Sequence, residues 1–326
     1  MIITRTPFRV SFVGGGSDLP VFFQEYGGAV LSSSIDKYMY ISSHDFFEKN
    51  KVRTKYSATE TVSSVQEIEH PILRTIMSKL NIGKGLEISS IADVPAGTGM
   101  GSSSSFTVGT LHNMMARKGM LKKVDKLWLA EEACQIEIHD LNEPIGKQDQ
   151  YAAAFGGLNL YRFNKDNEVL VKPMNLSDEA IKDFSSHLKL YYIGNQRSAS
   201  EILSKQSKDS LKADKIQALK TMVSFVDDFA DSLEAHQWKK CGEIIDENWK
   251  LKQSLTMGIS NSSIQNIYEL GKNNGAWGAK LLGAGGGGFM LFFAPPEKHS
   301  LLDQTIQLSP FPFELENFGS QVIFNG

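Results

Sequence analysis

Apolar residues along the first ninety positions alternate between strand-like and helical patterns. Residues 2–13 are rich in β-branched and aromatic side chains and stop at three consecutive glycines, which predicts a strand running into a turn. A second extended region is expected over 29–44. Apolar residues spaced by four predict a helix over 71–80, and the composition of 86–94 predicts another strand.

Helical patterns dominate the middle of the chain. A glycine- and serine-rich loop at 95–105 precedes a predicted helix over 106–118. Apolar residues at spacings of three and four predict a further helix over 124–141. Residues 157–171 again have the composition of a strand.

The second half of the chain differs from the first in its residue pattern. Polar residues and a proline at 173–178 predict a linker, and 201–255 is expected to be rich in helices. Segments 277–282 and 289–294 are predicted to be strands joined through the glycine run 283–288. Strands mixed with helices, without strict alternation, favour the α+β class.

The composition narrows the kind of partner. The chain has 326 residues, of which 41% are hydrophobic, so it is expected to fold into about two domains. The 34 basic and 37 acidic residues give a formal net charge of −3. Non-specific binding of nucleic acid needs a basic field, so no nucleic-acid partner is expected. A small molecule is the expected partner, and the oligomeric state is not readable from the sequence.

Cysteine content and hydropathy indicate the compartment. Cys134 and Cys241 form no CxxC pair and suit a reducing environment as small buried residues. The longest apolar run, 289–294, is much shorter than the roughly 20 residues that span a bilayer. Arginines interrupt the first strand before any signal-like apolar segment develops. We therefore expect a cytoplasmic protein with no membrane partner.

The stretch PAGTGMGSSSS at 95–105 carries the strongest chemical signal. Alternating glycines let the backbone approach a ligand closely, and the helix that follows offers free N–H groups and the positive end of its dipole. A phosphate fits this arrangement, and the serine hydroxyls are suited to a phosphate oxygen or to Mg²⁺. The alternative is a flexible turn with a serine helix cap. No lysine follows the last glycine, so this is not a GxxxxGK[ST] loop.

A second glycine run, 283–288, formally matches the GxGxxG fingerprint of dinucleotide-binding proteins. That fingerprint opens a helix, whereas strand-like residues follow here. The context argues against a dehydrogenase. We expect these glycines to let a loop pack against another backbone or close over the nucleotide site.

A third cluster combines Asp149, in the segment GKQDQ, with Glu137 on the preceding predicted helix. Phosphoryl transfer needs one carboxylate for the acceptor proton and another for the metal. Glu137 and Glu131 lie at opposite edges of the apolar stripe, so periodicity does not choose between them. Taken alone, each of these acids is more often solvated than catalytic.

In combination, these segments resemble the GHMP small-molecule kinase superfamily, which includes galactokinase, homoserine kinase and mevalonate kinase. The resemblance rests on the segments PFRVSF at 7–12 with Gly14 and Asp18, the loop 95–105, and residues 280–288. A closer resemblance is to bacterial D-glycero-α-D-manno-heptose 7-phosphate kinases. Its carriers are GGGSDLP at 14–20, GGAVLSSSIDKYMYIS at 27–42, GKQDQYAAAFGG at 146–157 and RSASEIL at 197–203.

This resemblance implies a fold and an activity. Residues 1–185 would form an N-terminal domain of the ribosomal protein S5 domain 2-like fold, which carries the phosphate loop. Residues 186–326 would form a ferredoxin-like C-terminal domain with added helices. The implied enzyme uses ATP and Mg²⁺ to phosphorylate the anomeric hydroxyl of heptose 7-phosphate, in nucleotide-activated heptose synthesis for cell-surface polysaccharide. A fucokinase- or galactokinase-type sugar kinase, or a non-catalytic sugar sensor, are the alternatives.

The resemblance also implies roles for single residues. Asp149 corresponds to the catalytic aspartate and Arg9 to the basic residue that stabilises it or the transferring phosphate. Glu137 with Ser102 or Ser103 corresponds to the Mg²⁺ site. The residues expected to bind ATP are Pro95, Gly97, Thr98, Gly99, Met100, Gly101, Ser102, Ser103 and Ser104. Those expected to bind the sugar are Asp18, Gly15, Gly16, Arg197, Lys147, Gly285 and Gly286.

Several of these assignments keep an alternative. Asp18 would contact a sugar hydroxyl; its other role would be to cap a helix that begins near residue 19, and the two roles are compatible. Galactokinases carry Glu and His where this chain has Gly15 and Gly16, which leaves room for a longer, phosphorylated sugar. The candidate ligands of that phosphate are Lys37, Lys55, Arg197 and Lys147, with Arg197 favoured for its bidentate geometry. Tyr56 and Trp277 are candidates to stack on the base, although such residues more often pack in or around a core.

Overall fold

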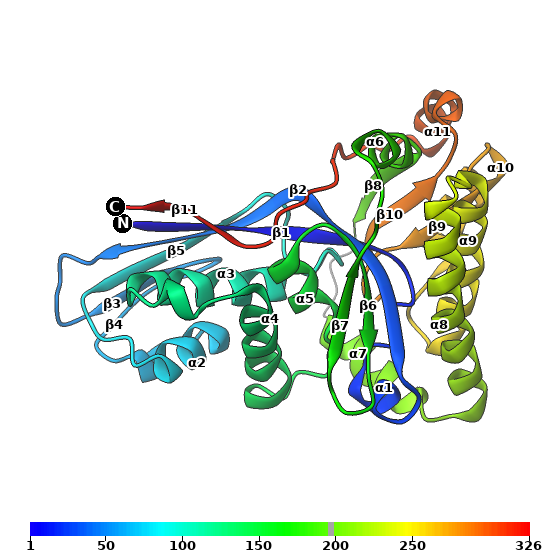
Figure 1. Cartoon of the computed structure of the whole chain (residues 1–326). Helices are drawn as coiled ribbons and strands as arrows, with labels where there is room; N and C mark the ends of the chain where they lie inside the picture. Colours follow the sequence, from blue (N-terminus) through cyan, green and yellow to red (C-terminus); the bar gives the residue numbers. More distant parts are fainter. Residues whose placement is uncertain (195–198) are drawn as a thin grey trace.

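The structure, a computed structural model, describes residues 1–194 and 199–326 (Figure 1). Within these residues the strands form two sheets, one of eight strands and one of three. The larger sheet and its helices occupy one end of the molecule, and the smaller sheet with two long helices occupies the other (Figure 1). Helices and strands are mixed without regular alternation, so the expected α+β class is confirmed.

The eight-stranded sheet is built around two long antiparallel strands. Its order is β11-β1-β2-β5-β3-β4, with β6 and then β7 attached to the other half of β2. The bounds are β1 (Ile2–Val13), β2 (Gly28–Asp45), β3 (Val52–Lys55), β4 (Thr59–Val62), β5 (Leu86–Ala92), β6 (Leu158–Phe163), β7 (Val169–Pro173) and β11 (Gln321–Asn325). Strand β11 returns the end of the chain to β1, so the two termini lie side by side (Figure 1).

Helices cover one face of this sheet. α3 (Ser102–Arg117) runs along β1 and β2 and is buried over most of its length, because α2, α4 and α5 pack around it. A Cβ on its Gly109 would lie 2.8 Å from Thr6 Oγ1, so glycine there permits the close approach to β1. The other α- and π-helices of this part are α1 (Pro20–Tyr26), α2 (Pro71–Lys79), α4 (Lys126–Cys134), the π-helix η3 (Gln135–Asp140) and α5 (Gln148–Phe155). Helix α6 (Asp178–Ser186) lies beside the smaller sheet (Figure 1).

The smaller sheet has the order β8-β10-β9 and is antiparallel throughout. An isolated bridge between Tyr191 and Pro310 adds a remnant of a fourth strand beside β8, which matches the strand order of a ferredoxin-like sheet. Helices α8 and α9 lie side by side (Figure 1), with α9 packed against β9 and α8 against β1 and β2 of the larger sheet. The bounds are β8 (Leu188–Gly194), α7 (Ala199–Asp209), α8 (Ala213–Glu234), α9 (Trp238–Leu255), α10 (Ser262–Asn273), β9 (Gly278–Leu281), β10 (Gly288–Phe293) and α11 (His299–Ile306).

One continuous core joins the two sheets. The ring of Phe12 on β1 lies 5.7 Å from that of Phe229 on α8 and 5.3 Å from that of Phe184 on α6. Phe184 in turn lies 5.5 Å from Phe293 on β10. These aromatic contacts fix one sheet against the other. The division into 1–185 and 186–326 stays a prediction, while the position of β11 places residues 321–325 with the first sheet.

Most predicted elements are confirmed, and three differ in detail. Helix α3 begins at Ser102 rather than near 106, because Gly101 caps it in a left-handed conformation with φ 77°. The helix predicted over 124–141 is α4 followed by a π-helix. The strand predicted over 157–171 is the hairpin of β6 and β7. Among the described helices, none is long and apolar enough to cross a membrane.

Candidate active site

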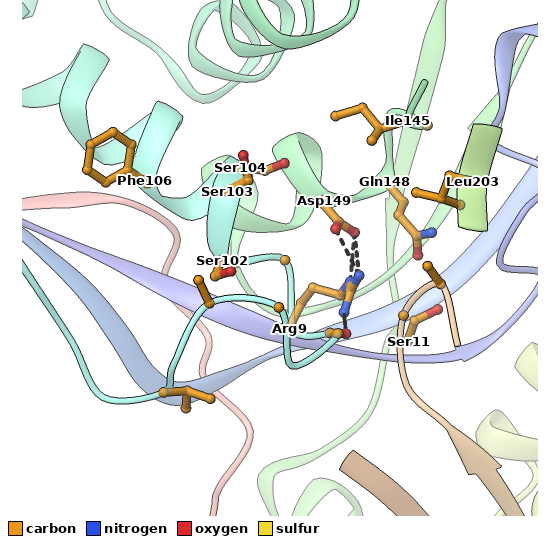
Figure 2. A pocket seen from close by; sticks show the side chains of 18 of the residues that line it. Arg9, Ser11, Ser102, Ser103, Ser104, Phe106, Ile145, Gln148, Asp149 and Leu203 are labelled. Atoms are coloured by element: carbon orange, nitrogen blue, oxygen red, sulfur yellow. Dashed lines mark hydrogen bonds and ion pairs between the residues drawn. The ribbon is translucent and has the colours of Figure 1, made fainter. Parts of the chain in front are cut away.

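A cavity of about 860 Å³ opens between the two parts of the molecule, within the usual range of roughly 300–1,000 Å³ for ligand pockets. Its wall combines β1, the loop after β5, the first turn of α3, the start of α5 and the glycine loop between β9 and β10. The side chains of Arg9, Ser11, Asp149 and Gln148 point into it (Figure 2). The cavity thus gathers all three motifs that the sequence singled out.

The phosphate loop forms one wall. Gly97, Gly99 and Gly101 have φ angles of 76°, 83° and 77°, in the left-handed region that favours glycine. Ser102, Ser103 and Ser104 open α3 and line the cavity. The first amides of a helix have no partner inside it and carry the positive end of its dipole, so this wall suits an anion. Pro95 lines it too, whereas Thr98 and Met100 are buried behind it.

The second glycine run supports the first. A Cβ on Gly99 would lie 2.5 Å from Leu282 O, and one on Gly283 would lie 2.5 Å from Gly99 Cα. A Cβ on Gly288 would lie 2.2 Å from Thr98 O. Any side chain at these positions would therefore force the loops apart. The expectation that this run packs against another backbone, and opens a strand rather than a helix, is confirmed.

Two glycines of this run do not line the cavity. A Cβ on Gly285 would lie 2.7 Å from Ile259 Cα, and the Gly286 N–H donates to Ile259 O at 2.9 Å. Their neighbours Gly283 and Ala284 do line it. The structure therefore places Gly285 and Gly286 as anchors of the loop, away from the expected sugar contact.

Arg9 and Asp149 face each other from β1 and α5. The Arg9 guanidinium donates to Asp149 through Nε at 2.7 Å and Nη2 at 2.8 Å (Figure 2). Its Nη1 donates to Gly99 O at 2.6 Å, so Arg9 also ties the phosphate loop to the carboxylate. Burial raises the pKa of Asp149, and the charge of Arg9 acts in the opposite direction. A quarter of the Asp149 side chain stays exposed, so a ligand in the cavity can reach it.

Glu137 lies behind the serines of α3. Its carboxylate accepts from Ser103 Oγ at 2.5 Å, Ser104 Oγ at 2.8 Å and Gln150 Nε2 at 2.8 Å. Burial raises the pKa of Glu137, while these hydrogen bonds lower it. Glu131, the alternative that periodicity left open, is exposed. Glu137 lies in the π-helix η3 and is buried together with both chain neighbours, so the structure favours it over Glu131.

Asp18 closes the opposite side of the cavity. Its Oδ1 accepts from Gly16 N at 2.9 Å and its Oδ2 from Gln148 N at 3.3 Å. A Cβ on Gly146 would lie 1.9 Å from Oδ2, so glycine is required there. Helix α1 begins after Leu19 without a side-chain cap, so the alternative role of Asp18 as its N-cap is wrong.

The proposed ligands of a second phosphate are not brought together. The Lys147 ammonium donates to Asn167 O at 3.0 Å and lies 5.2 Å from the Phe23 ring centre, outside the cavity wall. Lys37 pairs with Asp36, and Lys55 pairs with Glu87. Arg197 lies outside the described residues.

Sequence reasoning missed two lysines of the cavity wall. Lys280, the first residue of the segment 280–288, donates to Ser11 O at 2.6 Å and Phe12 O at 2.9 Å. Burial holds the pKa of Lys280 well below its usual range. Lys252 reaches the wall from α9. The sequence pattern of α9 is amphipathic, like that of many helices, and does not distinguish Lys252. Only the packing of α9 beside the turn at Gly15 shows that this lysine lines the cavity.

An aromatic group lines the end of the cavity near β5. The rings of Tyr56 and His70 are 4.7 Å apart, and those of His70 and Phe106 are 4.8 Å apart and stacked. Burial lowers the pKa of His70, which favours the uncharged ring. Trp277 instead packs on His187 and Phe293 in the second part of the molecule.

Two family descriptions match the chain and together cover both parts of this architecture. The GHMP kinases N terminal domain matches residues 65–157, and the GHMP kinases C terminal domain matches residues 229–302. The chain is a GHMP kinase. Together with its sugar-kinase relatives, this makes it a sugar kinase that transfers a phosphoryl group from ATP to an alcohol.

Known relatives of this GHMP kinase extend along nearly its whole length. The D-glycero-alpha-D-manno-heptose 7-phosphate kinase of Campylobacter jejuni is 28% identical, over 91% of this chain and 90% of the relative. The bifunctional fucokinase/GDP-fucose pyrophosphorylase of Arabidopsis thaliana is 26% identical, over 92% of this chain and 30% of that protein.

A solved structure supports the architecture. The crystal structure of a D-glycero-D-manno-heptose 1-phosphate kinase from Bacteroides thetaiotaomicron has a TM-score of 0.81 and 21% identity, and the match covers 100% of both chains. The two-part GHMP kinase fold, with an S5 domain 2-like N-terminal part and a ferredoxin-like C-terminal part, is thereby confirmed.

Proposed function

We propose that this kinase transfers the γ-phosphoryl group of ATP to the anomeric hydroxyl of D-glycero-D-manno-heptose 7-phosphate, giving the 1,7-bisphosphate. The observation that carries the proposal is the Arg9–Asp149 pair, which faces the glycine-lined wall across one cavity. The similarity to the heptose 7-phosphate kinase, over nine-tenths of both chains, supports this choice of sugar. The product would serve nucleotide-activated heptose synthesis for cell-surface polysaccharide.

In the proposed reaction, the triphosphate binds along residues 97–104, where the first amides of α3 are free to donate. The anomeric oxygen attacks the γ-phosphorus, the bond from that phosphorus to the bridging oxygen breaks, and ADP leaves. Asp149 accepts the proton of the hydroxyl. Arg9 holds the carboxylate through two hydrogen bonds and keeps it beside the Gly99 carbonyl. Asp18 is proposed to bind a sugar hydroxyl next to Gly15 and Gly16.

The residues around Glu137 fit a magnesium ion. Mg²⁺ prefers oxygen ligands and is usually held by one or two carboxylates together with substrate phosphates. Glu137 and the Ser103 hydroxyl, 2.5 Å apart beside the phosphate loop, supply such oxygens, and Ser102 lies next to them. When bound there, Mg²⁺ would neutralise charge on the phosphates. Ser104 and Gln150 would orient the Glu137 carboxylate.

The aromatic end of the cavity is proposed to receive the adenine. Tyr56, His70 and Phe106 present ring edges and faces beyond the phosphate loop. A flat, uncharged base gains from packing against such rings. The two cysteines are free and buried, in keeping with a proposed cytoplasmic location.

A fucokinase-type acceptor is the second candidate, because a fucokinase relative also matches over 92% of this chain. The test is a panel of heptose 7-phosphate, unphosphorylated heptose, fucose and galactose with ATP and Mg²⁺, measured by ADP release. We expect the highest kcat/KM with heptose 7-phosphate and the new phosphate on C1. Preference for an unphosphorylated hexose would overturn the substrate, and sugar binding without ADP release would favour a sensor.

The same panel with Asp149→Asn tests the mechanism. The amide has nearly the shape of the carboxylate but does not accept the proton, so turnover should fall by about 10²- to 10⁴-fold. Binding of ATP, measured by calorimetry, should persist. Wild-type turnover in this variant would show that Asp149 is not the base.

A further inference from the structure

Lys252 is a buried cation at the end of the cavity beside the β1–α1 turn. It is 7% exposed and lines the cavity. Its ammonium donates to the Gly15 carbonyl at 3.2 Å and to Gln206 Oε1 at 3.0 Å. Both acceptors are uncharged, and in the described part of the chain no carboxylate forms an ion pair with it. A buried charge is costly unless it is paired, so this lysine is poised for an anion.

Gly16 creates the space that Lys252 and Gln206 occupy. A Cβ on Gly16 would lie 2.4 Å from Gln206 Nε2 and 3.0 Å from Lys252 Nζ. The sequence predicts open space for a longer sugar at Gly16, and the structure shows that the side chains of Lys252 and Gln206 lie in this space. Any larger residue there would displace the ammonium.

Other polar atoms around this turn lack partners. Ser11 Oγ, Gln148 Oε1 and Gln206 Nε2 are buried and make no hydrogen bond in the described structure. Ser11 and Gln148 both line the cavity (Figure 2). A Cβ placed on Gly15 would lie 3.6 Å from Ser11 Oγ and 3.8 Å from Gln148 Nε2. Buried polar atoms are nearly always paired in folded proteins. These unpaired polar atoms near the turn at Gly15 and Gly16 indicate a polar ligand at this end of the cavity.

The charges that face Lys252 come from two neighbouring elements. Burial lowers the pKa of Lys252 to about 8, while the negative charge of Asp18 acts to raise it. Lys280 on β9 is close enough for the two ammonium groups to repel each other. An anion bound between these lysines would relieve that repulsion and favour the charged form of both.

The contacts of Lys252 argue against a phosphate of the nucleotide as this anion. The phosphate loop is tied to Arg9 and to Glu137 through its serines, whereas Lys252 contacts the turn at Gly15 and Gly16, beside the carboxylate of Asp18. The lysine therefore belongs to the acceptor's end of the cavity.

Resting on the proposed function, we propose that Lys252 binds the phosphate that the acceptor sugar already carries. Gln206 positions the ammonium through Oε1. A phosphate accepts such charged hydrogen bonds readily. The enzyme would thereby select phosphorylated sugars over free ones.

The test compares KM for heptose 7-phosphate and for unphosphorylated heptose in the wild type and in Lys252→Met. We expect KM for the phosphorylated sugar to rise about ten- to hundredfold, as for loss of one charged hydrogen bond. KM for heptose and for ATP should stay unchanged. An unchanged KM for heptose 7-phosphate, or equal rises for both acceptors, would overturn the role of Lys252.

Lys239→Met is the matched control on the same helix, because that side chain is 69% exposed and should change neither KM. If Lys252→Met does not fold, the pH dependence of the wild-type enzyme tests the inference instead. The ratio of kcat/KM for heptose 7-phosphate to that for heptose should fall as pH rises through about 8, because the ammonium then loses its proton. A flat ratio would overturn the inference. A wild type inactive on every sugar phosphate would instead refute the proposed function.

Discussion

Gly101 ends the phosphate loop and lies against the proposed catalytic carboxylate. Its φ of 77° is left-handed, and a Cβ there would lie 3.3 Å from Asp149 Oδ2. Gly119, just beyond the other end of α3, has a similar φ of 68° but nothing within 4 Å of a Cβ. Substitutions at these two glycines therefore distinguish the effect of backbone strain from the effect of contact with Asp149.

Gly101→Ala and Gly119→Ala should each lower the free energy of unfolding by about 1–2 kcal/mol, because alanine is strained in the left-handed region. Only Gly101→Ala should also lower kcat, by roughly tenfold or more, since a small displacement of Asp149 misaligns it. Chemical denaturation and steady-state kinetics measure the two effects. Equal kcat values in both variants would show that the geometry at Asp149 tolerates this contact.

At this scale the sequence is informative where chemistry needs a particular residue type. The alternating glycines and Asp149 could be singled out because a phosphate cradle and a base have few substitutes. Lys252 could not, because a lysine on an amphipathic helix usually faces solvent. Only its tertiary neighbours, Gly16 and Gln206, make it a buried cation.

Among the elements, the π-helix η3 has the clearest consequence for the site. The Leu141 N–H donates to Ile136 O, five residues back, so the side chains after α4 shift relative to a regular helix. Glu137 lies within this π-helix and contacts the serines of α3, whereas Glu131 lies in the preceding regular helix α4 and is exposed. Such bulges occur frequently at functional sites.

Glu137→Gln should raise the Mg²⁺ concentration needed for half-maximal activity by at least about tenfold, because an amide replaces the proposed carboxylate ligand. Glu131→Gln, the matched change on the exposed face of α4, should leave the Mg²⁺ dependence unaltered. Activity titrated with Mg²⁺ at saturating ATP measures both. An identical titration for the two variants would contradict the assignment of Glu137.

Element prediction succeeded for long, regular patterns and failed for short or tertiary ones. Helix α2 follows a clear apolar periodicity and strand β2 was expected as an extended region, and the structure confirms both. Strand β11 has exposed apolar residues and exists because β1 offers an unpaired edge. No local pattern in the sequence encodes that pairing.

For the whole molecule, the shared core decides how the cavity is built. Phe12, Phe184 and Phe229 pack together and hold the second sheet against the end of β1. Backbone contacts such as Gly99 with Gly283 join the two glycine loops across this junction. Each half therefore supplies part of the site. The motifs in the sequence predict the fold class, but they do not predict how the two halves meet at this junction.

The location of a bound nucleotide tests the central claim most directly. A crystal structure with a non-hydrolysable ATP analogue, Mg²⁺ and heptose 7-phosphate should show the triphosphate along residues 97–104 at the start of α3. The anomeric hydroxyl should lie within hydrogen-bonding distance of Asp149. A triphosphate bound elsewhere in the cavity, or an anomeric hydroxyl turned away from Asp149, would contradict the account.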